Sequence, residues 1–134
     1  MSSQAPVART PGATRAGAGQ YLFDLAKLNK IKGGPDYSSV EGGCVEGDRM
    51  IVALMRMPAG TGAEPHSHPN EQWIYILEGT FRAKVGDTEV EAKPGSVLYI
   101  PSNVIHSGKA TSDGDVVFFT VKDASHSLHG MKAA

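Results

Sequence analysis

The most regular feature of this chain is an alternation of side-chain character with a period of two, which is typical of half-buried β-strands. Residues 81–85 and 88–91 each alternate uncharged with charged side chains. Gly86-Asp87 separates these two runs, and a glycine at the first central position suits a two-residue type II′ turn. We therefore predict a β-hairpin at this point.

Turn signals divide most of the remaining chain into further short runs of strand character. Gly47-Asp48, Pro94-Gly95 and Asp113-Gly114 each precede or separate apolar runs. The runs predicted as strands are residues 40–45, 49–57, 73–77, 97–100 and 116–121. Only residues 23–30 predict a short turn of helix, ended by Gly33-Gly34-Pro35. About seven or eight short strands at regular spacing indicate an all-β sandwich or barrel.

Residues 73–77 and 116–121 are apolar on both faces of their predicted strands. Such strands need cover on both sides, from the barrel interior on one and from a second sheet or a subunit partner on the other. Trp73 and Tyr75 share the face opposite Gln72, so we expect them to pack against that second sheet or partner. The residues expected to fill the core are Cys44, Met50, Met55 and Met57.

The two ends of the chain differ in composition from its centre. Residues 1–19 are rich in Ala, Gly, Pro, Ser and Thr, and their only large aliphatic residue beyond the initial Met is Val7. Such a segment has little to bury, so we expect a disordered tail over residues 1–19, a barrel over 20–123 and a C-terminal tail over 124–134. His126 and His129 lie in that last tail, which is predicted either to be flexible or to cover the barrel mouth or a neighbouring subunit.

Composition narrows the class of protein. The 134 residues include 13 Lys and Arg against 14 Asp and Glu, which fits a single domain and excludes a strongly basic nucleic-acid-binding face. The longest apolar stretch, residues 50–57, is too short to cross a membrane and contains Arg56. A single cysteine, Cys44, cannot form an internal disulfide, and the first residues lack the apolar segment of a secretory signal. We therefore expect a cytoplasmic protein.

Three histidines and a glutamine carry the candidate chemistry. His66 and His68 point to the same face of an extended chain, because side chains repeat every two residues. Pro69-Asn70 should then bend the chain, so that Gln72 at the start of the next strand can return its amide oxygen to the same point. His106 follows the strand over 97–100. Three neutral nitrogens and one oxygen suit one Fe, Mn, Ni, Cu or Zn ion and leave one or two coordination positions open.

The spacing of these residues resembles the two motifs of the cupin superfamily. The positions that match the two motifs are Gly60, His66, His68, Gly79, Gly95, Pro101 and His106. Gln72 stands where the family usually has Glu, and Asn103 replaces a Gly. The resemblance covers most of residues 21–123. It implies an RmlC-like double-stranded β-helix, or jelly-roll barrel, with a flexible N-terminal arm.

The resemblance also implies a homodimer with a metal site made of His66, His68, Gln72 and His106. Small cupins with three His and one Gln include a cupin of uronate catabolism, polyketide cyclases and an isomerase of antibiotic biosynthesis. A neutral Gln ligand leaves the full positive charge on the metal, which should raise its Lewis acidity. We therefore expect one divalent transition metal per chain and isomerase, lyase or cyclase chemistry on a small oxygenated organic substrate. The alternatives are an Fe(II)-dependent, cofactor-free dioxygenase and a non-enzymatic cupin that binds a small ligand.

Three further polar residues are candidate site residues. Tyr99 lies on the strand that leads to His106 and is a candidate acid–base group. Glu71 precedes Gln72, and strand parity favours a surface role for it over acid–base catalysis. Arg56 interrupts an apolar strand, either as a solvated outward residue or as a clamp for a substrate carboxylate in the barrel mouth.

Overall fold

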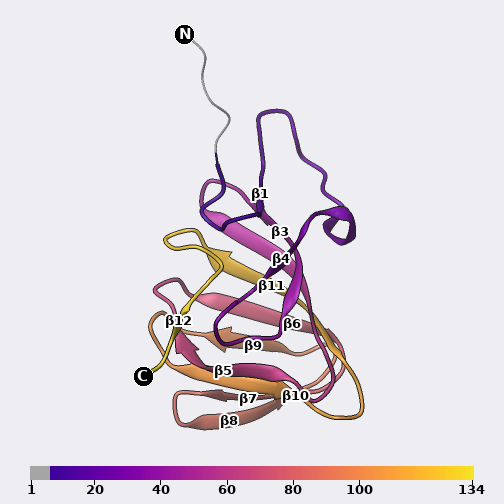
Figure 1. Ribbon diagram of the computed structural model, residues 1–134, viewed down its shortest axis with the longest axis vertical. Helices are drawn as coiled ribbons and strands as arrows, with labels where there is room; N and C mark the ends of the chain where they lie inside the picture. The colour runs from indigo at the N-terminus through magenta and orange to yellow at the C-terminus, as the bar shows by residue number, and fades with distance from the viewer. Residues whose placement is uncertain (1–6) are drawn as a thin grey trace.

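The computed structural model describes residues 7–134, which form two mainly antiparallel sheets packed face to face (Figure 1). The first sheet has the strand order β1-β3-β4-β11-β6-β9, with β2 paired to β3, and the second has the order β12-β5-β10-β7-β8. The strands are β1 (Thr14–Arg15), β2 (Lys30–Lys32), β3 (Glu41–Glu46), β4 (Met50–Met57), β5 (Gly62–Ser67), β6 (Gln72–Glu78), β7 (Phe81–Val85), β8 (Thr88–Ala92), β9 (Val97–Ile100), β10 (His106–Ala110), β11 (Val116–Asp123) and β12 (Met131–Lys132). The predicted all-β class is confirmed.

The local patterns account for most of these strands. The hairpin of β7 and β8 pairs Val85 with Thr88 around a two-residue turn, and Gly86 has the positive φ of 59° that a type II′ turn requires. The predicted helical turn shrinks to one 3₁₀ turn over Leu25–Lys27, because Asp24 caps it and the backbone returns to an extended conformation at Leu28.

The core lies between the two sheets. Alternate residues of β4 and β11 point inward, and β11 lies between β4 and β6. Cys44, Met55 and Met57 are buried, as the sequence predicts, whereas Met50 is 48% exposed. Met50 starts its strand on the outward parity, so the prediction that it fills the core is wrong. The structure has no helix within residues 7–134 of the length and apolar character needed to span a membrane.

The N-terminal segment is more firmly attached than its composition predicts. Residues 1–6 of the expected tail lie outside the described residues. Thr14 and Arg15 form a short parallel pairing with β3. The fully buried carboxylate of Glu46 accepts hydrogen bonds from the backbone N–H groups of Arg9 and Thr10, at 2.7 and 3.0 Å. These two charge-assisted hydrogen bonds attach the N-terminal segment to β3, although the segment has little apolar surface to bury.

The C-terminal segment is held against β5 and Asn70, and we call residues 124–132 the strap. The Asn70 side-chain amide donates to the carbonyls of Asp123, His126 and Ser127. Leu128 is 3% exposed, and its N–H donates to Thr10 Oγ1. The strap ends as β12, which pairs with β5 (Figure 1). The structure therefore attaches this segment to the barrel, with Leu128 in the lining of the internal cavity, and does not support a free tail.

Candidate metal centre

Three histidines from two adjacent strands meet inside the barrel. His66 and His68 lie on β5 and just beyond its end, and His106 opens β10 directly opposite His66 in the strand register. One ligand nitrogen from each ring lies within 4.8 Å of the others, and all three side chains are buried. The period of two places His66 and His68 on one face, as predicted, and the pairing of β5 with β10 brings in the third imidazole.

In each of the three rings, the same nitrogen faces a backbone carbonyl oxygen. Nδ1 lies 2.6 Å from the Glu64 carbonyl oxygen in His66, 2.8 Å from that of Asn70 in His68, and 2.9 Å from that of Val104 in His106. A carbonyl only accepts, so Nδ1 carries the proton of a neutral ring in His66 and His106 and leaves a lone pair on Nε2, whereas both nitrogens of His68 face an oxygen that only accepts. This backbone support of the distal nitrogen is the arrangement found around metal-ligating histidines.

Gln72 directs its oxygen to the same point. Thr120 Oγ1 donates its only proton to the Trp73 carbonyl at 2.8 Å, so it must accept from the Gln72 amide nitrogen, which lies 2.8 Å away. That contact fixes the side-chain amide and turns Oε1 towards His68 Nε2, at 3.0 Å. A neutral His68 has one proton for two oxygen acceptors, so it can donate either to the Asn70 carbonyl or to Gln72 Oε1, and a cation bound by Nε2 and Oε1 would satisfy both atoms.

Burial keeps these ligands neutral. Desolvation, with further repulsion from the neighbouring histidines and Lys122, lowers the pKa of His66 to about 3 and that of His68 to about 4. Burial also lowers the pKa of His106. Nε2 of His106 is buried and has no hydrogen-bond partner among the described residues. A neutral, unpaired, buried imidazole nitrogen fits a metal ligand, so the residues present fit a divalent transition metal.

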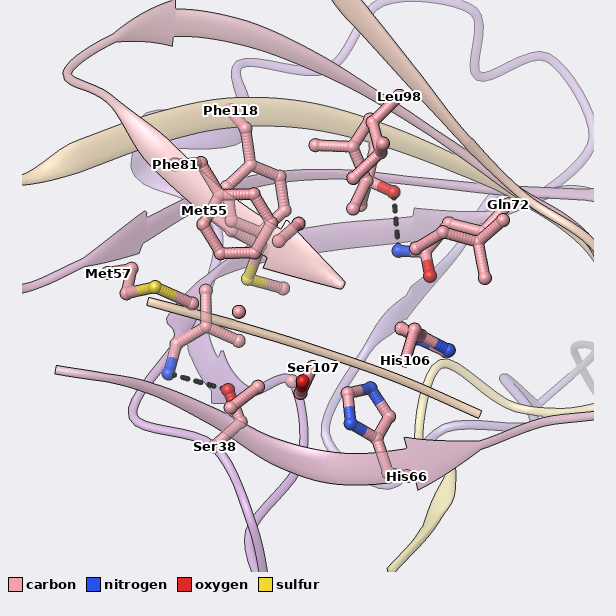
Figure 2. Close-up of a pocket in the computed structure, with 18 of the residues that line it drawn as sticks. Ser38, Met55, Met57, His66, Gln72, Phe81, Leu98, His106, Ser107 and Phe118 are labelled. Carbon is pink, nitrogen blue, oxygen red and sulfur yellow. Dashed lines mark hydrogen bonds between the residues drawn. The ribbon is translucent and has the colours of Figure 1, made fainter. Parts of the chain in front are cut away.

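A cavity of about 70 Å³ adjoins the cluster. Figure 2 shows His66, His106 and Gln72 towards one end of it and the apolar side chains of Phe81, Met55, Met57 and Phe118 towards the other. An enclosed apolar cavity with a few convergent polar groups is the usual form of a small-molecule site.

Two polar residues of this cavity were not predicted as site residues. Tyr37 stacks on the His66 ring at a centroid distance of 4.1 Å, and its hydroxyl oxygen accepts the Gly130 N–H at 2.7 Å. Lys122 lies on β11 and is 4% exposed. Tyr37 lies in a loop without periodicity, so no pattern marks it. Lys122 shares its inward parity with Phe118 and Thr120, and that signal could have identified it.

Tyr99 and Glu71 lie outside the barrel. Leu98 and Ile100 are the inward residues of β9, so Tyr99 points outward, where it is 40% exposed and stacks on Trp73 at 4.5 Å. Its hydroxyl donates to the Glu71 carboxylate at 2.7 Å. Strand parity therefore corrects the acid–base role considered for Tyr99 and Glu71, because neither side chain faces the histidine cluster.

Arg56 is also outside the cavity. Met55 and Met57 occupy the inward positions of β4, and Arg56 forms an exposed ion pair with Asp115 at 3.0 Å. The structure thus corrects the idea that Arg56 clamps a substrate carboxylate and supports its solvated alternative.

The fold and the motif agree with comparisons to known proteins. The sequence model described as the cupin domain matches residues 53–122, just over half of the chain. No sequence among curated proteins matches this chain.

Many solved structures share the fold. A cupin-2 domain from Rhodospirillum rubrum superposes with a TM-score of 0.70 at 16% identity, over 85% of this chain and 80% of that one. The polyketide cyclase RemF of Streptomyces resistomycificus gives 0.68 at 19% identity, over 78% and 80%. A predicted oxalate decarboxylase of Thermotoga maritima gives 0.66 at 21% identity, over 77% and 98%. At these identities the likeness establishes the fold alone.

Proposed function

Because this chain belongs to the cupin family, whose jelly-roll fold it has, we propose that it is a metal-dependent enzyme acting on a small oxygenated organic molecule. His66, His68, His106 and Gln72 would hold one divalent transition metal. The observation that carries this proposal is the convergence of buried lone pairs, with His106 Nε2 left unpartnered beside the cavity. When bound, such a metal would polarise a carbonyl or enol oxygen, as isomerisation, elimination or cyclisation requires.

The residues of this chain define what the site can do with a substrate. Gln72 is neutral and held by Thr120, so the ligand set adds no negative charge to the site. The apolar wall of the cavity excludes water from the reacting group, which strengthens electrostatic contacts there. Among solved structures of the same fold are a polyketide cyclase and a predicted oxalate decarboxylase, which supports the choice of a small-molecule reaction.

Metal analysis of freshly purified, untagged protein tests the proposal. We expect about one equivalent of a divalent transition metal per chain, because the chain offers one set of four candidate ligands. His106→Ala should lose most of that metal, whereas the matched control His126→Ala, outside the cluster, should keep it. Iron in the site would favour the dioxygenase, which consumes O₂, and nickel, zinc or manganese would favour the isomerase or lyase. Wild-type protein that holds no metal even after reconstitution would contradict the proposal and leave a ligand-binding barrel.

We also propose that the partner of this chain is a second copy of itself. The outer face of β6 and β9 carries Trp73, Tyr75, Leu77, Val97 and Tyr99, each between 40% and 55% exposed. A contiguous apolar patch of this kind is typical of an interface. Trp73→Glu should convert a dimer into a monomer in sedimentation experiments, and Arg82→Glu on the other sheet should not. A wild-type monomer at all concentrations would refute the dimer.

A further inference from the structure

One charged side chain inside the barrel has no counter-charge. Lys122 is the last inward residue of β11, directly across from Gln72 in the strand register, and it lines the cavity beside the histidine cluster. Within residues 7–134, no carboxylate lies within ion-pair distance of its ammonium group. Its one hydrogen-bond acceptor there is the carbonyl oxygen of Leu128 in the strap.

The acidic groups closest to Lys122 do not neutralise it. Burial raises the pKa of the Cys44 thiol to about 12, so that side chain is uncharged at neutral pH. Asp123 points away from the cavity, where its carboxylate accepts from the N–H groups of Glu71 and Ser125, at 2.8 and 3.0 Å. An ammonium group buried without a partner charge is costly, and this burial lowers the pKa of Lys122 to about 7.

Attachment of the strap does not account for this cost. The strap is already held by the Asn70 amide, by the hydrogen bond from Leu128 N–H to Thr10, and by the pairing of β12 with β5. A methionine has nearly the same shape as lysine and would fill this space without a buried charge. Costly buried amines inside a ligand cavity are more often functional than structural.

We propose that Lys122 selects an anionic substrate by binding its carboxylate inside the cavity, in the position that the Leu128 carbonyl now occupies. This inference rests on the proposed function, since a metal held by the histidine cluster and Gln72 would bind a second oxygen of the same substrate. The cavity, of about 70 Å³, favours a small molecule. The substrate class that fits both Lys122 and such a metal is therefore a small carboxylic acid with an adjacent carbonyl or hydroxyl oxygen.

Pyruvate and pyruvamide are suitable probes, because they have nearly the same shape and differ in charge. In calorimetric titrations of zinc-loaded protein we expect pyruvate to bind at least about tenfold more tightly than pyruvamide, as a hydrogen-bonded charge pair predicts. Lys122→Met should reduce this preference to about onefold by weakening pyruvate alone. Lys122→Arg should retain it, and the control Lys109→Met, which changes an exposed lysine of β10, should leave it unchanged.

A purely structural role for Lys122 would weaken both probes equally, and that result would overturn the inference. An unchanged preference in Lys122→Met, or no preference in the wild-type protein, would do the same. If Lys122→Met fails to fold, Lys122→Gln replaces it, and thermal unfolding of each variant establishes that it is folded. If the wild-type protein binds no zinc, the proposed function fails, and the same ratio measured in metal-free protein still tests Lys122.

Discussion

Acidification of the metal-free protein should destabilise it strongly in a narrow pH range. The pKa values of His66 and His68 are about 3 and about 4 in the folded protein, and an imidazole in an unfolded chain has a value near 6.5. The unfolded chain therefore binds more protons between pH 6.5 and pH 4. The free energy of unfolding falls as the pH falls through this window. The stability that the two neutral histidines contribute is complete only above their unfolded pKa of about 6.5.

The magnitude follows from these values. Between pH 7 and pH 5 each of these two histidines removes about 2 kcal/mol, so together they remove about 4 kcal/mol, and His106, whose pKa burial also lowers, adds a further loss of the same sign. Lys122 lowers the free energy of unfolding by less than about 1 kcal/mol more over the same range, because its amine is nearly fully protonated in both the folded and the unfolded state at pH 5. Asp113, Asp115 and Asp123 have pKa values below the ordinary 3.8 and stay ionised throughout. The histidines therefore dominate this range among the groups with shifted pKa values.

Urea denaturation in the presence of EDTA measures this effect. With a denaturant slope of about 2 kcal/mol/M, the midpoint should fall by about 2 M between pH 7 and pH 5. His68→Gln should reduce that shift by about 1 M, since it removes one of the histidines with a lowered pKa. Midpoints at pH 7 and pH 5 that agree within about 0.5 M would show that the histidines are not buried as neutral rings, and the reasoning about the ligand set would fail.

Three further predictions concern the supports of the site and of the fold. Thr120→Val removes the acceptor that orients Gln72. Zinc affinity, measured by competition with a chelator, should fall about tenfold while the thermal unfolding temperature changes little. Unchanged zinc affinity would mean that Gln72 is not held for the metal. Gly79→Ala places a Cβ 2.1 Å from the Asp115 carbonyl oxygen at a φ of 80°, so it should lower the free energy of unfolding in urea by more than about 2 kcal/mol. The control Gly95→Ala, whose Cβ meets no atom within 4 Å, should lower it by about 1 kcal/mol. Equal costs for the two glycine variants would contradict the close approach. Asn70→Ala removes the amide that holds two strap carbonyls and that of Asp123, so the backbone amides of the strap should exchange hydrogen at least about tenfold faster; exchange at the wild-type rate would show that β12 alone holds the strap.

Local patterns were enough to predict most of the fold and which side chains of the candidate ligand set share a face. Period-two alternation predicted the hairpin of β7 and β8 and the outward face of Trp73 and Tyr75. The same parity placed His66 and His68 on one face. The position of His106 beside them depends on the pairing of β5 with β10, and the resemblance between the two motifs and a known fold supplied what parity cannot.

Long-range contacts account for what the sequence did not predict. Tyr37 reaches His66 from an irregular loop, and the Glu46 carboxylate holds backbone groups about 37 residues earlier in the chain. A low-complexity composition predicted a free N-terminal tail, because composition records what a segment can bury and not which carboxylate its backbone meets. Tyr99 could not be assigned to a face, because a four-residue strand gives too few alternations to fix its parity.

The closure of the barrel joins the two extremes of the chain. The hydrogen bond between Leu128 N–H and Thr10 Oγ1 spans 118 residues, and Thr10 is itself held by Glu46. Contacts of such long sequence separation carry a high loop-closure entropy and cannot form until both segments have been synthesised. All four candidate ligands precede the strap in the sequence, so on the ribosome the ligand set emerges before the strap does.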